Sequence, residues 1–182
     1  MFQKIHHKNC NDALHVLDYI KLESNRNLKA LYSPGHAKHH YSFYDEFSGT
    51  LFMGDTLGLI YPHGDFVQPN LPPPDFDKEI LFKTLDSFEK LEINQLAIAH
   101  FGIHKNAREL IKDAKESIEN WILFISNIEN LSNDDASNEL LKWLIRNYES
   151  LGIDNETIKN YIGNGNFVMQ IEGIRNYLRR RS

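Results

Sequence analysis

The sequence predicts an α/β protein, with a mixed β-sheet and helices followed by further helices. Three observations lead to this prediction. Short segments rich in aromatic and β-branched residues, separated by Asn, Gly, Ser or Pro, fill residues 13–54 and are typical of strands. A helix–strand–helix pattern then runs to about residue 130, and only helical patterns follow from residue 132. We therefore expect a sheet-containing domain over residues 1–130 and a helical extension over residues 131–182.

Four strands are expected in the first part, in the segments LHVLDYIKL, LKALYS, HYSFYDEF and TLFMG. The connection DEFSGT is typical of a hairpin, because Gly49 can adopt a positive φ angle. Residues 61–76 contain five of the six prolines, which predicts a long loop without regular structure.

The next segment, residues 75–92, is expected to be a helix capped by Asp75 or Asp77. Its predicted inner face consists of Ile80, Leu81, Leu85, Phe88 and Leu91. A short buried strand, INQLAIAH, ends at His100, and a second helix is expected from about Ala107 to Ile128. Its apolar face consists of Leu110, Ile111, Ile118, Trp121, Ile122 and Ile125. Three more helices are expected after residue 132, with Gly152 and Gly163 as C-caps.

Composition narrows the possible functions. A formal net charge of −5 and an isoelectric point near 6.0 argue against nucleic acid as the main partner. The single cysteine, Cys10, allows no internal disulfide and suits a reducing compartment, so we expect a cytoplasmic protein. The apolar runs are too short for a membrane span or for the core of a signal peptide.

Side chains that can bind metals follow three of the predicted strands. His36 comes after LYSPG, Asp55 after TLFMG and His100 after LAIA. An α/β sheet normally exposes its site at the carboxyl ends of strands, and imidazole and carboxylate groups are ligands for zinc or iron. Gly35 and Gly54 would allow sharp turns before two of these residues. Each alone is more often a turn residue, but the three in this order favour a metal site.

The segments SPGHAKHHYSFYDEFSGTLFMGDT and LAIAHFG resemble the second half of metallo-β-lactamase-fold hydrolases, in the branch that contains hydroxyacylglutathione hydrolases. The resemblance covers about residues 15–180 and implies the second αβ half of a four-layered αββα sandwich. It also implies that His36 binds a first metal ion and His100 a second. Asp55 would bridge the two ions and orient the attacking hydroxide.

The HxHxDH motif, which supplies further ligands from the N-terminal half of this family, has no counterpart in the sequence. The adjacent His6 and His7 would point to opposite faces of a strand and are interpreted as surface residues. The resemblance therefore implies an incomplete metal site. The first half would be absent, lie outside this chain, or be supplied by another chain, and we expect a homo-oligomer or pairing with that half.

The resemblance implies one or two zinc ions, with iron as an option, and hydrolysis of a small ester or thioester by a metal-activated hydroxide. Around the site, His40 is interpreted as a residue that packs below the ligands. His104, interpreted as a helix-start residue, and Tyr61 could touch substrate. Two alternatives remain open. One is an iron-dependent protein resembling persulfide dioxygenases, and the other is a non-enzymatic remnant that acts as an oligomerisation or binding module.

Overall fold

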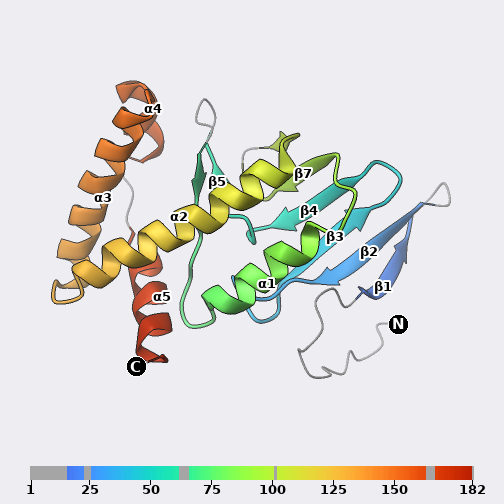
Figure 1. The fold of residues 1–182 in the computed structure, drawn as a ribbon, viewed down its shortest axis with the longest axis horizontal. Helices are drawn as coiled ribbons and strands as arrows, with labels where there is room; N and C mark the ends of the chain where they lie inside the picture. Colours follow the sequence, from blue (N-terminus) through green and yellow to red (C-terminus); the bar gives the residue numbers. More distant parts are fainter. Residues whose placement is uncertain (1–15, 23–25, 62–65, 101, 163–166, 182) are drawn as a thin grey trace.

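The computed structural model describes residues 16–22, 26–61, 66–100, 102–162 and 167–181. Its strands are β1 (Val16–Lys21), β2 (Asn27–Tyr32), β3 (Tyr41–Asp45), β4 (Thr50–Gly54), β5 (Leu59–Ile60), β6 (Val67–Gln68), β7 (Gln95–Ile98) and β8 (Ile103–His104). Its helices are α1 (Lys78–Phe88), α2 (Ala107–Asn127), α3 (Asn133–Ser150), α4 (Asn155–Tyr161) and α5 (Val168–Arg179). The predicted α/β class with a mixed sheet is confirmed (Figure 1).

Six strands form one sheet in the order β1-β2-β3-β4-β7-β8, and β5 pairs with β6 in a separate ribbon. Strands β1 to β4 form an antiparallel meander, whereas β7 pairs with β4 in parallel and with β8 antiparallel. Strands β2, β4 and β7 therefore run in the same direction. As a result, their carboxyl ends meet at one edge of the sheet, and these are the strands that His36, Asp55 and His100 follow.

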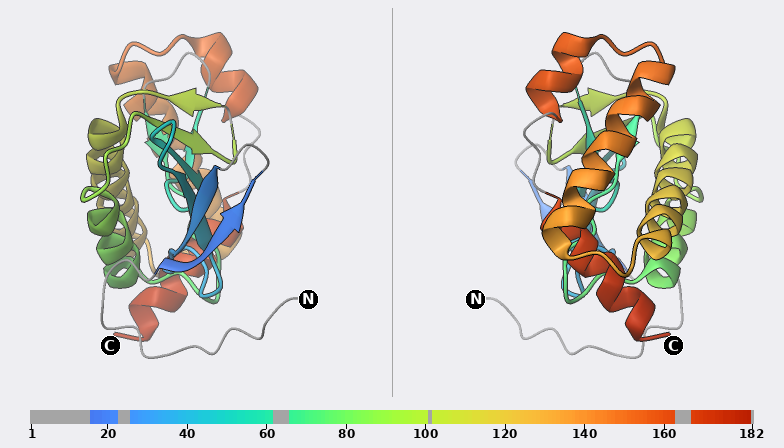
Figure 2. Two further views of the ribbon diagram at one scale, coloured as in Figure 1. Left: turned by 90° about the vertical axis from the view of Figure 1, so that its right-hand side faces the viewer. Right: turned by 90° about the vertical axis from the view of Figure 1, so that its left-hand side faces the viewer.

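The two faces of the sheet differ in what covers them. Helices α1 and α2 lie along one face of the sheet (Figure 2). Leu51 is paired with Leu96, and both are fully buried, which assigns their side chains to this covered face. On the opposite face, Phe52 is paired with Ala97, which is paired with Ile103. Phe52 is 42% exposed and Ile103 is 62% exposed. The second face is thus apolar and partly open to solvent in the described part of the chain.

Helix α1 begins at the predicted cap, because the Asp77 carboxylate accepts a hydrogen bond from the Ile80 backbone N–H at 3.0 Å. Leu81, Leu85 and Phe88 are buried as expected. Ile80, however, was assigned to the inner face and is exposed. Successive residues are about 100° apart around the axis of a helix. The buried stripe runs through Leu81, Leu85 and Phe88, so Ile80, which precedes Leu81, lies at the border of this stripe.

Helix α2 buries most of its predicted face, namely Leu110, Ile111, Ile118, Trp121 and Ile125, while Ile122 is partly buried. Buried side chains of α3 and α5, such as Leu144 and Ile171, belong to the same hydrophobic cluster as those of the sheet and α2. The division at residue 130 stays a prediction. None of the described helices has the length and apolar composition needed to cross a membrane.

Two expectations about connections were wrong. The segment 61–76 contains strand β6, which pairs with β5, so it is not wholly irregular. His104 lies in strand β8 and not at a helix start, because α2 begins at Ala107. Gly152 follows α3 with a φ of 79°, which suits a C-terminal turn, and Gly163 lies outside the described residues.

Candidate functional site

The carboxyl ends of β4 and β7 bring Asp55 and His100 together. The His100 Nε2 atom lies 3.2 Å from Asp55 Oδ1. This contact lacks hydrogen-bond geometry, and Asp55 Oδ1 is buried without a hydrogen-bond partner in the described part of the chain. A buried polar atom in this state costs about 1–3 kcal/mol, and more for a charged group. Asp55 Oδ1 is therefore a polar atom that the described part of the chain leaves without a hydrogen bond, with the imidazole of His100 beside it.

His36 is buried and follows β2 at the same edge of the sheet. Its Nδ1 atom lies 2.9 Å from the Asn70 backbone carbonyl oxygen. A carbonyl can only accept, so Nδ1 carries the proton and donates it. In the neutral tautomer with the proton on Nδ1, the lone pair lies on the other ring nitrogen, Nε2, and this is the arrangement in which a histidine binds a metal through Nε2.

The turn before His36 is held by helix α1. The Thr84 hydroxyl donates to the Pro34 carbonyl oxygen at 2.7 Å. Gly35 has a φ of 124°, and a methyl group at its Cα would lie 2.3 Å from the Leu81 Cα atom. Only glycine fits this close approach without moving the helix.

His40 is hydrogen-bonded on both ring nitrogens. The Asp55 backbone N–H donates to His40 Nε2 at 3.4 Å, so Nε2 is the acceptor and Nδ1 carries the proton. Nδ1 then donates toward two hydroxyls, Ser33 Oγ at 2.8 Å and Thr56 Oγ1 at 3.0 Å. His40 thus links strand β2 to the turn that carries Asp55.

The surroundings keep His40 neutral. Burial, followed by the proximity of His36, lowers the pKa of His40 to about 4, while Asp55 acts in the opposite direction. The rings of His36 and His40 meet edge to face, with centroids 5.7 Å apart. A side-chain carbon at Gly54 would lie 2.6 Å from His40 Nε2, so the small residue before Asp55 leaves room for this ring.

The side chains of His36, Asp55 and His100 are of types that bind metal ions, but too few of them are brought together in the described part of the chain for a complete site. Imidazole and carboxylate groups are ligands for zinc and iron, and the unpartnered Asp55 Oδ1 is the atom that a cation would satisfy. Yet among the described residues no group of three or more His, Cys, Asp or Glu side chains could hold a metal ion. Catalytic zinc sites normally have three protein ligands. The adjacent His6 and His7 lie outside the described residues.

Tyr61 and His104, the two residues expected near a substrate, lie directly after strand β5 and within strand β8. The Tyr61 hydroxyl, at the end of the β5–β6 ribbon, accepts a hydrogen bond from Gln68 Nε2 at 3.4 Å. His104 is paired with Leu96 in the middle of β7, and its Nε2 atom is buried without a hydrogen-bond partner among the described residues. His104 therefore lies beside the middle of β7, whereas His100 follows the carboxyl end of the same strand.

Three residues around the candidate ligands were missed from the sequence, namely Ser33, Thr56 and Asn70. Thr56 directly follows the Gly-Asp turn, and this position could have suggested a role. Ser33 lies next to the Pro-Gly-His turn, but Ser is common in such turns. Asn70 acts through its backbone carbonyl, which leaves no signal in the sequence.

Comparison with known proteins supports the fold. Neither a protein-family model nor a curated protein matches the chain significantly. Among solved structures, a metallo-beta-lactamase family protein from Thermus thermophilus aligns over 90% of this chain and 47% of its own, with a TM-score of 0.59 and 18% identity. An archaeal metallo-beta-lactamase superfamily protein from Sulfolobus tokodaii aligns over 56% of this chain and 36% of its own, with a TM-score of 0.46 and 25% identity.

The apo chemotaxis sensor ODP from T. denticola aligns over 57% of this chain and 52% of its own, with a TM-score of 0.44 and 21% identity. The fold conclusion depends on the Thermus protein, whose TM-score is the highest of the three. The chain therefore has part of the metallo-β-lactamase fold. It spans about half the length of the Thermus protein that it matches.

Proposed function

We propose that this chain is the half of a metal-dependent hydrolase of the metallo-β-lactamase fold that supplies His36, Asp55 and His100 to the metal site. A second αβ half would supply the remaining ligands. The observation that carries the proposal is Asp55 Oδ1, which is buried without a hydrogen-bond partner among the described residues, 3.2 Å from His100 Nε2. An anionic oxygen and an imidazole nitrogen in this arrangement are donors of the kind that can bind one zinc or iron ion together.

Each residue has a defined task in this proposal. His36 and His100 would each offer a neutral imidazole nitrogen, and Asp55 would offer a carboxylate that also orients the attacking water. His40 holds the Asp55 backbone through its hydrogen bond with the Asp55 N–H. A bound zinc or iron ion would lower the pKa of its water to about 7 and so provide hydroxide at neutral pH. We propose a small ester or thioester as the substrate, and the cytoplasm as the location.

The second half would cover the open face of the sheet. Phe52 and Ile103 leave an apolar surface on that face, and a sheet in an α/β protein normally packs a layer on each side. One added layer would thus bury the apolar face and bring further ligands to the edge with Asp55. That layer could belong to a longer polypeptide, to a separate chain or to another copy in a homo-oligomer.

The test compares the chain alone with the chain mixed with, or fused to, the N-terminal half of the Thermus relative. We expect thioester turnover near background for the chain alone and a gain of at least about 100-fold after complementation, since metal activation of water contributes several kcal/mol. Asp55→Ala in the fused protein should abolish the gain. A fused protein that folds, binds metal and remains inactive would contradict the proposal. Iron in place of zinc, with persulfide oxidation, would favour the dioxygenase alternative.

A second candidate function is a non-catalytic binding or oligomerisation module. The exposed Phe52 and Ile103, together with the low number of metal donors among the described residues, favour it. The two candidates differ in the complemented protein. Association of the halves without metal-dependent turnover would support the module, whereas turnover that depends on Asp55 would support the hydrolase.

A further inference from the structure

A groove with a volume of about 600 Å³ lies between α2, α3 and strand β6. Figure 1 shows α2 and α3 meeting at the end of the molecule where the C-terminal helices gather. The volume falls within the range of about 300–1,000 Å³ that is usual for sites of small molecules. None of the three candidate metal ligands is among its lining residues, so this groove is separate from the site described above.

The floor of the groove is aromatic. Trp121 from α2 and Tyr148 from α3 are buried there. Trp143 contributes a partly exposed indole ring that stacks on Phe124, with centroids 4.8 Å apart. The ring of Phe66 stacks on Tyr148, with centroids 3.9 Å apart and an interplanar angle of 27°. Aromatic faces carry partial negative charge and attract cations that lie within about 6 Å of the ring centre.

The wall of the groove carries negative charge. Asp113 and Glu116, one turn apart on α2, both line it, and no Lys or Arg does so in the described part of the chain. Neither carboxylate forms an ion pair with a described residue. Burial, and then the charges of Glu109 and Glu116, raise the pKa of Asp113, while the charge of Lys112 acts in the opposite direction and is outweighed. The negative charge of this wall is therefore only weakly compensated by the protein.

We propose that the groove between α2 and α3 binds an organic cation with an apolar body, of the quaternary or alkylated ammonium class. The aromatic floor would contact the alkyl groups, and Asp113 and Glu116 would balance the charge. An anionic ligand would meet two carboxylates, and an uncharged apolar ligand would exclude water from them without compensation. The proposal does not depend on the proposed hydrolase function, because it uses none of the metal donors.

The chain contains two tryptophans, and both line the groove, so indole fluorescence reports on its occupancy directly. The probe is choline, and its control is 3,3-dimethylbutan-1-ol, which has nearly the same shape without the charge. We expect choline to change the emission in a saturable way. We expect the alcohol to bind at least about tenfold more weakly, since cation–π contacts contribute about 0.5–2 kcal/mol.

Matched variants separate the groove from general charge effects. Asp113→Asn with Glu116→Gln should weaken choline binding at least about tenfold, with the melting temperature retained as evidence of folding. Glu119→Gln is the control, because Glu119 lies on the same helix but is placed 3.6 Å from Lys78 and does not line the groove. The proposal is wrong if choline gives no saturable change, if the alcohol binds equally well, or if Glu119→Gln weakens binding as much as the double variant.

Discussion

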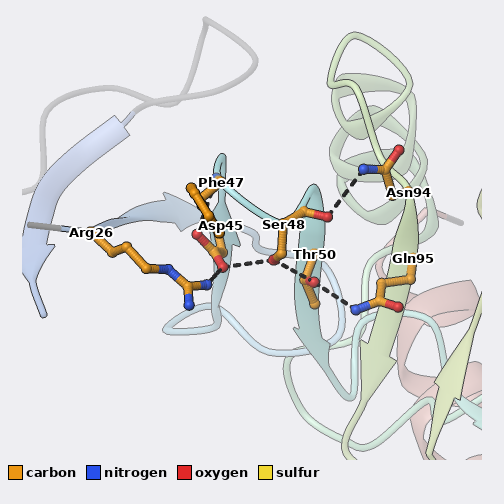
Figure 3. A network of polar contacts seen from close by, with 7 residues as sticks. All are labelled: Arg26, Asp45, Phe47, Ser48, Thr50, Asn94 and Gln95. Atoms are coloured by element: carbon orange, nitrogen blue, oxygen red, sulfur yellow. Dashed lines mark hydrogen bonds and ion pairs between the residues drawn. The ribbon is translucent and has the colours of Figure 1, made fainter. Parts of the chain in front are cut away.

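Two aspartates at opposite edges of the sheet differ in how their charges are satisfied. Asp45, at the end of β3, is 2% exposed, and its carboxylate accepts hydrogen bonds from the Ser48 hydroxyl at 2.6 Å and the Phe47 N–H at 3.2 Å. It also pairs with the Arg26 guanidinium group (Figure 3). Asp55, at the end of β4, keeps a buried Oδ1 atom without any hydrogen-bond partner in the described part of the chain.

The Asp45 network continues across the sheet. The Ser48 and Thr50 hydroxyls lie 2.7 Å apart, and Gln95 Nε2 donates to Thr50 Oγ1 at 2.8 Å (Figure 3). These contacts join β3, β4 and β7 at one edge. Buried polar groups in proteins are normally satisfied in this way. The contrast indicates that the Asp45 edge stabilises the fold, whereas the Asp55 edge contains a buried polar atom that the described residues leave uncompensated. The metal site that we propose would satisfy this atom.

The largest expected effect is on activity at the Asp55 edge. In the complemented protein, Asp55→Ala should lower kcat/KM by more than about 1,000-fold, because metal activation contributes several kcal/mol. His40→Gln should lower it by only about 10–100-fold, the usual cost of losing a residue that supports a ligand. Steady-state kinetics with metal analysis makes the comparison. Equal losses at both positions, with metal content unchanged, would remove Asp55 from the set of ligands.

The second effect is on stability, and the order of the two edges is reversed. Asp45→Asn should lower the free energy of unfolding of the lone chain by about 1–3 kcal/mol, because it weakens the hydrogen bonds of a buried carboxylate and leaves the partly exposed Arg26 without its charged partner. Asp55→Asn should leave it unchanged or raise it by up to about 1–3 kcal/mol, because the substitution removes a charge whose buried Oδ1 atom has no hydrogen-bond partner among the described residues. Urea unfolding of both variants measures the difference. A larger loss at Asp55 than at Asp45 would break the comparison.

The third effect is a surface effect on the open face of the sheet. Ile103→Lys should reduce self-association of the lone chain at micromolar concentration, because Ile103 is 62% exposed and is paired with Ala97 on the open face of the sheet. Leu123→Lys is a matched control, since Leu123 has the same exposure, 62%, but lies on helix α2. Sedimentation velocity measures both. A monomeric wild-type chain, or equal effects of the two variants, would count against the open face as the contact surface.

The smallest effect is a pH dependence. The Ser48 hydrogen bond, followed by the Arg26 and Phe47 contacts, holds the pKa of Asp45 below its ordinary value of 3.8. A lowered pKa in the folded state means that this contribution is fully present above the unfolded pKa and disappears as the pH falls through the folded one. Between about pH 6 and about pH 3, Asp45→Asn should therefore lose less stability than the wild type. Thermal melts of both proteins across this pH range measure the difference. Equal losses of melting temperature in the variant and the wild type would contradict the prediction.

The order of the main helices and strands could be predicted from the sequence, because long apolar periodicities and cap residues such as Asp77 mark them. The strand ends that carry His36, Asp55 and His100 could be predicted for the same reason. The two-residue strands β6 and β8 could not, since two residues have no periodicity. The contact of Arg26 with Asp45 joins side chains 19 positions apart, and nothing in the local sequence indicates it.

The most direct test of the central claim is the zinc affinity of the lone chain, measured by competition with a chromophoric chelator at neutral pH. We predict a Kd for zinc above about 1 μM, which corresponds to a binding free energy smaller in magnitude than about 8 kcal/mol, because too few ligand side chains are assembled. Complete structural zinc sites reach binding free energies of about 10–16 kcal/mol in magnitude. Asp55→Ala should abolish this weak binding, and an added N-terminal half should tighten it. Tight binding of two ions by the lone chain would contradict the account and would require His6, His7 or His15 as ligands.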